Sequence, residues 1–196
     1  MPDGTEVLVD PAVSRGKFER ELANYRTFED AMQRRGQWLL RAEFPEVFTV
    51  FAAPRGTPPV VVFGALLDYT NYDLWPPSVR LVNPFTRQPY RYAELLTRLP
   101  RRDPAAPPPA VPGMPTPVQE LMQAFKPEDV PFLCVPGTRE YHANPGHSGD
   151  DWLLRRADGE GSIYNILDVL WRYGVDPIAG LQMQMTLAPA FDRIPE

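Results

Sequence analysis

The fold is decided by two neighbouring apolar stretches, Val47-Phe-Thr-Val-Phe-Ala-Ala53 and Val60-Val-Val-Phe-Gly-Ala-Leu-Leu67. Both are rich in β-branched and aromatic residues, which favour extended backbone on a pleated surface. The intervening Pro54-Arg-Gly-Thr-Pro-Pro59 has the composition of a turn, because proline and glycine interrupt regular hydrogen bonding. With Val79-Arg-Leu-Val82 as a third short strand, the pattern predicts an antiparallel β-meander.

Amphipathic helices are expected on both sides of this meander. From Ser14 to about Arg35 apolar residues recur at spacings of three and four, which is typical of a helix with one apolar stripe. Near the C-terminus Ser162 can cap a helix that Gly174 and Pro177 end. The sequence therefore predicts an α+β fold: an antiparallel β-meander flanked by an N-terminal and a C-terminal helix. The stripe residues are Phe18, Leu22, Tyr25, Phe28 and Met32 in the first helix and Ile163, Ile166, Leu167, Leu170 and Trp171 in the second.

The segment from Pro100 to Pro117 interrupts this pattern, because 8 of its 18 residues are proline. Neither helix nor sheet is expected to propagate through it, so we interpret residues 100–117 as an exposed, extended insertion. Val118 to Phe125 is expected to form a short helix. Since 196 residues suffice for one hydrophobic core with additional loops, residues 1–196 are expected to form a single domain.

Composition and charge exclude several classes of partner. The net charge of −5 and a pI near 5.1 give no basic surface for a nucleic-acid backbone. No apolar run approaches the roughly 18 to 20 residues that a membrane span needs. The N-terminal residues are too polar and acidic for a signal peptide, so we expect a cytoplasmic protein that binds neither nucleic acid nor membrane.

Every cysteine and histidine of the chain lies within one 14-residue stretch that begins at Cys134 and ends at His147. Taken singly, a cysteine is usually a small buried apolar residue and a histidine a satisfied polar group. Together, Cys134, Glu140, His142 and His147 offer thiolate, carboxylate and imidazole, the donors that bind a borderline-soft divalent cation. The spacing matches neither a zinc ribbon nor a His-Glu-x-x-His helix.

These four side chains could converge on one ion. In an extended segment Glu140 and His142 would point to the same face, because alternate residues of a strand do so. Pro136-Gly137 and Pro145-Gly146 are turn sequences that could bring Cys134 and His147 back toward them. We therefore predict one divalent metal ion, zinc first, held by Cys134, Glu140, His142 and His147, with Asp150 and Asp151 as outer partners of the imidazoles.

The segment Tyr72-Asp-Leu-Trp-Pro-Pro-Ser-Val-Arg-Leu81 resembles the Tyr-Pro-Phe-x-Pro-Pro-x-Val-x-Phe segment of ubiquitin-conjugating enzymes and their relatives. Tyr72, Pro76, Pro77 and Val79 are in register, whereas Asp73 and Trp75 depart from that pattern. The order of helix, strands, cysteine loop and helix also matches. This resemblance implies a ubiquitin-conjugating-enzyme-like fold. The His-Pro-Asn triplet that precedes the catalytic cysteine in those enzymes is missing between Met122 and Leu133.

The segment from Cys134 to His147 resembles a family of bacterial predicted metal-binding domains named for a Cys-Glu-His-His signature, which this chain matches at the four residues above. The resemblance covers residues 15 to 177 and is sharpest over 134 to 152. Proteins of that family are associated with bacterial ubiquitin-like conjugation operons. The implied partners are therefore a ubiquitin-like protein or the enzymes of its conjugation pathway.

Three functions follow, and the sequence leaves them open. The first is a non-catalytic zinc protein, an accessory or regulatory component of a bacterial ubiquitin-like conjugation pathway. The second is a metal-dependent hydrolase in which Glu140 leaves the metal and acts as general base, or a variant with Glu140 and both histidines on iron. The third is an active conjugating enzyme with Cys134 as thioester nucleophile and Arg139 or Asn144 as oxyanion donor.

Overall fold

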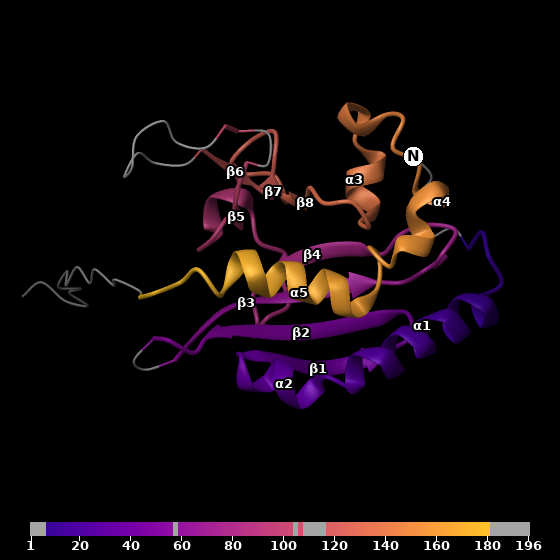
Figure 1. The fold of residues 1–196 in the computed structure, drawn as a ribbon, viewed down its shortest axis with the longest axis horizontal. Helices are drawn as coiled ribbons and strands as arrows, with labels where there is room; N and C mark the ends of the chain where they lie inside the picture. The colour runs from indigo at the N-terminus through magenta and orange to yellow at the C-terminus, as the bar shows by residue number, and fades with distance from the viewer. Residues whose placement is uncertain (1–6, 57–58, 104–105, 108–116, 181–196) are drawn as a thin grey trace, which may run out of the picture.

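The computed structural model describes residues 7–56, 59–103, 106–107 and 117–180 (Figure 1). Its main element is a four-stranded antiparallel sheet in the order β1-β2-β3-β4. The strands are β1 (Gln37–Glu43), β2 (Glu46–Ala53), β3 (Val60–Asp68) and β4 (Ser78–Val82). The predicted meander is confirmed, with one strand more than expected. Strand β1 is an edge strand with only a short apolar run, Trp38-Leu-Leu40, and Arg41 and Glu43 on it are exposed.

The two predicted amphipathic segments are helical, and the helices pack against one face of this sheet. These are α1 (Pro11–Arg26), α2 (Glu29–Arg34) and α5 (Ile163–Gly174). The predicted single helix of residues 14–35 is in fact two helices: Thr27 leaves the helical ladder and its hydroxyl donates to the Asn24 carbonyl at 2.7 Å. Ser162 caps α5 as expected, with its Oγ accepting from the Asn165 amide at 3.2 Å. None of the described helices is long and apolar enough to cross a bilayer.

The core lies between the sheet and these helices. Phe18 and Tyr25 of α1 and Ile166 and Leu170 of α5 are at most 1% exposed. They pack in one cluster with the inward-facing residues of the strands, among them Phe51. Burial of such side chains contributes about 1.5–3 kcal/mol each, so this layer dominates the stability of the fold.

The stretch after β4 corrects two predictions. Strands β5 (Pro100–Arg102) and β6 (Val118–Glu120) pair with each other, and β7 (Met122–Gln123) pairs with β8 (Phe132–Leu133). Sheet therefore does enter the proline-rich segment at Pro100, which as the first residue of a strand needs no ladder donor. The predicted helix at 118–125 is wrong: these residues form β6, a bend at the buried Leu121, and β7. Residues 104–105 and 108–116 of the predicted insertion lie outside the described residues.

Short helical elements complete the chain around the candidate site. They are η1 (Tyr92–Glu94), α3 (Arg139–Ala143), η2 (Pro145–His147), α4 (Trp152–Arg155) and η3 (Arg156–Asp158). Helix α3 contacts both β4 and β8. In Figure 1, α3 and α4 lie close together at one end of the sheet, where the segment from Cys134 to Asp151 is placed.

Candidate functional site

Cys134 is fixed at the exit of strand β8. Its amide donates to the Leu121 carbonyl at 2.7 Å, and the residue is 6% exposed. The chain then reverses at Gly137, whose φ of +93° favours glycine and where a Cβ would lie 2.5 Å from the Glu160 backbone. Buried Thr138 closes this turn by donating to the Leu133 carbonyl at 2.9 Å. The turn therefore delivers the chain into α3 with a defined orientation.

Helix α3 directs Glu140 and His142 to different sides. The prediction that this segment is extended is wrong, and in a helix residues two apart are rotated by roughly 200°. The Glu140 carboxylate turns toward β4, where it accepts a hydrogen bond from the Ser78 hydroxyl and one from the Val79 amide at 3.3 Å. The structure therefore separates Glu140 from the other three predicted ligands.

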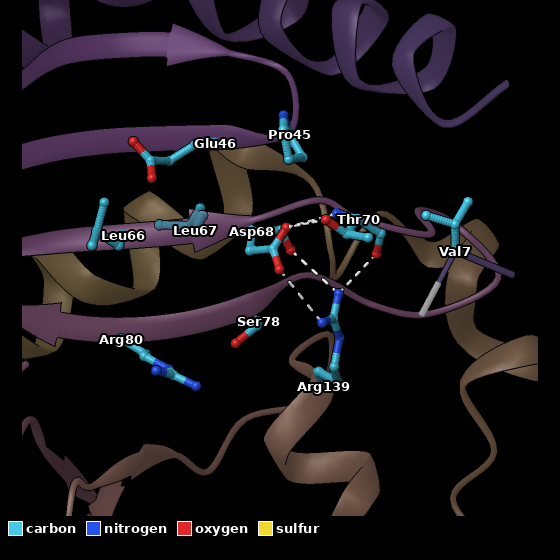
Figure 2. A pocket seen from close by; sticks show the side chains of 10 residues that line it. All are labelled: Val7, Pro45, Glu46, Leu66, Leu67, Asp68, Thr70, Ser78, Arg80 and Arg139. Atoms are coloured by element: carbon cyan, nitrogen blue, oxygen red, sulfur yellow. Dashed lines mark hydrogen bonds and ion pairs between the residues drawn. The ribbon is translucent and has the colours of Figure 1, made fainter. Parts of the chain in front are cut away.

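Arg139 holds α3 against the end of the sheet from the same side. Its guanidinium donates to the Thr70 carbonyl at 2.8 Å and to the Pro76 carbonyl at 3.3 Å, and lies 3.6 Å from an Asp68 carboxylate oxygen. Figure 2 shows the contacts of Arg139 with Thr70 and Asp68, beside a cavity of about 640 Å³ at the ends of β3 and β4. The Arg139 guanidinium therefore binds the end of the sheet and does not face Cys134, as the hypothesis of an oxyanion donor would require.

Cys134 and His147 meet on the other side of α3. The Cys134 Sγ and the His147 Nε2 are 3.3 Å apart, so the predicted return of the chain at Pro145-Gly146 brings these two groups together. The Asn144 side chain accepts from the Gly146 amide at 2.9 Å and closes that turn. The Tyr141 ring stacks on the His147 ring, with centroids 3.8 Å apart. Burial raises the pKa of the Cys134 thiol.

His142 has one nitrogen fixed and the other unpaired. Its Nδ1 is 2.8 Å from the Asp150 carbonyl oxygen, and because a carbonyl only accepts, Nδ1 carries the proton. In the neutral imidazole the lone pair is then on Nε2; this atom is buried, and it has no hydrogen-bond partner in the part of the chain that the structure describes. Metal-binding histidines commonly donate from one nitrogen to a carbonyl and bind with the other.

Asp150 links the two histidines through further contacts. Its carboxylate accepts from the Tyr141 hydroxyl at 2.8 Å and pairs with Arg155. The hydrogen bond from Tyr141 lowers the pKa of Asp150, while burial and that hydrogen bond raise the pKa of Tyr141 to about 12. Asp150, a predicted outer partner of the imidazoles, contacts the His142 ring, but through its backbone carbonyl and not through its carboxylate. Sequence reasoning missed Tyr141 and Arg155, because neither belongs to a ligand motif.

A cavity of about 590 Å³ adjoins the two histidines. Its walls come from the segment before β4, from the loop that follows His147 and from α4. Most of the wall is apolar, and both histidines of the chain border it. The lining residues are Leu8, Leu74, Trp75, Pro76, His142, His147, Ser148, Gly149, Asp150, Asp151, Trp152 and Leu153.

The donor set fits a metal ion in part. From bond lengths of about 2.3 Å to sulfur and 2.0 Å to nitrogen, a sulfur and a nitrogen ligand of one tetrahedral zinc lie roughly 3.5 Å apart, close to the 3.3 Å between Cys134 and His147. The His142 ring donates from Nδ1 to a backbone carbonyl, which is the tautomer that leaves Nε2 able to bind a metal ion. Glu140 does not fit, since Ser78 and Val79 hold it elsewhere. Among the described residues, no three His, Cys, Asp or Glu side chains are gathered closely enough to hold an ion.

Comparison with known proteins places the chain in a family. A protein named y4jH from Sinorhizobium fredii is 43% identical over 192 residues, which cover 92% of this chain and 91% of the relative. The sequence profile of the Y4jH-like family matches residues 9–178, a range that includes the sheet, α3 and the whole segment from Cys134 to Asp151. The chain therefore belongs to the Y4jH-like family, which has a bacterial member in y4jH.

Proposed function

We propose that this chain is a zinc-binding protein in which Cys134, His142 and His147 hold one divalent ion, and that it serves as an accessory component of a bacterial ubiquitin-like conjugation pathway. The observation that carries the metal proposal is His142. A buried imidazole nitrogen with a lone pair and no partner is costly unless something binds it, and a cation would satisfy it.

The position of Cys134 and His147 supports the same proposal. A thiol and an imidazole already at 3.3 Å need little rearrangement to become ligands of one ion. Tyr141 holds the His147 ring from one face and connects it to the loop that orients His142. When bound, zinc would cross-link β8, α3 and η2, and its binding energy would add to the stability of the fold.

The pathway half of the proposal rests on the scaffold. The residues that match the ubiquitin-conjugating enzymes, Tyr72, Pro76, Pro77 and Val79, are all buried, whereas the departures Asp73 and Trp75 are partly exposed. The shared residues are thus those with a packing role, and the differences lie where packing constrains less. An N-terminal helix, a four-stranded meander and a cysteine loop before a last helix have the order of that scaffold.

Element analysis of protein purified without a histidine tag tests the metal proposal. We expect one zinc per chain in the wild-type protein and loss of zinc in Cys134→Ser and His147→Gln. Glu140→Gln is the matched control, because it changes the remaining residue of the predicted four and should keep one zinc. Metal-free wild-type protein, or equal zinc in all variants, overturns the proposal. Titration with a bacterial ubiquitin-like protein, followed by NMR, tests the pathway half.

Thiol chemistry at Cys134 is the second candidate, favoured by the same 3.3 Å contact to His147, which could act as its base. Two observations count against it: burial raises the pKa of the thiol, and Asn144 is occupied in its own turn. Thioester formation with a ubiquitin-like protein, detected on a non-reducing gel, would favour this candidate. The metal hydrolase with Glu140 as general base has no such support, because Glu140 faces Ser78.

A further inference from the structure

The cavity beside His142 and His147 combines apolar walls with one sign of charge. Trp75 and Trp152 both line it, together with three leucines. The Trp152 ring is held in place because its Nε1 donates to the Asp73 carbonyl at 2.9 Å. Leu8, Leu74 and Leu153 are 40–47% exposed, so apolar side chains also surround the mouth. Concave apolar sites of several hundred Å³ with a few polar groups are typical of small-ligand binding.

The charges of the cavity come from carboxylates. Asp150 and Asp151 line it, and no lysine or arginine is among its described lining residues. Arg155 compensates Asp150, whereas no ion pair to Asp151 occurs among the described residues. A carboxylate without an ion pair at an apolar cavity favours a cationic ligand, because it attracts a cation and repels an anion.

Cys134 does not line this cavity, and the Nε2 atom of His142 is buried from solvent. The Cys134 thiol and the His142 Nε2 atom therefore do not open onto the cavity, and its apolar wall stays free. We infer that the cavity binds a small organic cation with an aromatic body, an arylalkylammonium compound. This site does not require zinc: His142 and His147 border the cavity, but its apolar walls and its carboxylates belong to other side chains.

Three indoles of nearly equal shape separate the charge effect from the apolar effect: cationic tryptamine, neutral 3-ethylindole and anionic indole-3-propionate. The imidazole Hε1 signals of the two histidines, the only two in the chain, report binding in the cavity by NMR. We expect tryptamine to shift both signals and to bind about three- to tenfold more tightly than 3-ethylindole, with indole-3-propionate weakest. Equal binding of the three, or no shift at either histidine, overturns the inference.

Asp151→Asn isolates the charge without disturbing the local fold. Asp151 caps α4 by accepting from the Leu153 amide at 2.9 Å, and asparagine is an equally good cap. We expect tryptamine to lose about threefold in affinity and 3-ethylindole to be unchanged. Asp30→Asn, which removes the same charge from an exposed position on α2, should change neither. A loss of tryptamine affinity in the Asp30 variant, or none in the Asp151 variant, contradicts the assigned role.

Discussion

The two sides of α3 differ in how completely their polar groups are satisfied. On the sheet side, Arg139 and Glu140 have protein partners from β3, β4 and the segment between them. On the opposite side, His142 has a buried nitrogen without a hydrogen-bond partner among the described residues, and the Cys134 thiol contacts the His147 imidazole. Satisfied polar groups stabilise a fold, whereas a buried unsatisfied one costs free energy unless a water, an ion or another ligand binds it. One side of this five-residue helix is therefore structural, and the other is the side on which we propose binding.

The largest effect that would test this difference is stabilisation by zinc. An ion that binds only the folded chain stabilises it by about 4 kcal/mol at a thousandfold excess over its dissociation constant. We expect urea unfolding of wild-type protein to show a gain of this size with zinc, and His142→Gln to lose most of it. Magnesium, which prefers oxygen ligands, is the control ion and should give no gain. An equal gain from zinc in the variant would remove His142 from the site.

The next largest effect lies on the sheet side. Arg139→Met removes the guanidinium and leaves the Thr70 and Pro76 carbonyls and the Asp68 carboxylate without that partner, so we expect a loss of about 2–4 kcal/mol in the free energy of unfolding. Arg80→Met is the matched control: this exposed arginine has no hydrogen bond or ion pair among the described residues, so its loss should stay within about 0.5 kcal/mol. Similar losses in both variants would show that Arg139 does not hold α3 against the sheet.

Substitution of Arg155 tests whether the ion pair with Asp150 keeps the proposed metal ligands in position. Arg155→Gln frees the Asp150 carboxylate, whose residue orients His142 through its carbonyl and Tyr141 through its side chain. Loss of such an outer contact typically weakens metal binding by about tenfold or more, which competition with a chelator would measure. Arg155→Lys should restore part of the affinity. Arg156→Gln, an exposed neighbour that lies 4.0 Å from Asp73, should leave it unchanged.

The sequence predicted the framework better than the site. The runs that became β2, β3 and β4 and the stripe of α5 carry periodicity, because one face of each element is buried. Strand β1 has weak periodicity, and β7 is too short to show any. In the site, the return of His147 to Cys134 could be predicted from Pro145-Gly146. The direction of Glu140 could not, because it depends on α3 being helical, and α3 owes its position to contacts with residues distant in sequence, such as Thr70 and Ser78.

The smallest effect sharpens the comparison most, because it should change one side of α3 and leave the other intact. Ser78→Ala removes the hydroxyl that donates to Glu140, while the Val79 amide remains as a partner at 3.3 Å. We expect a loss of about 1 kcal/mol in the free energy of unfolding, the usual value of one hydrogen bond to a part-buried group. Zinc affinity should not change, because Glu140 is not a ligand in the proposed site. Ser148→Ala, at an exposed serine on the His142 side of α3, should cost less. If Ser78→Ala weakens zinc binding more than it weakens the fold, Glu140 acts on the metal, and the two sides of α3 are a single site.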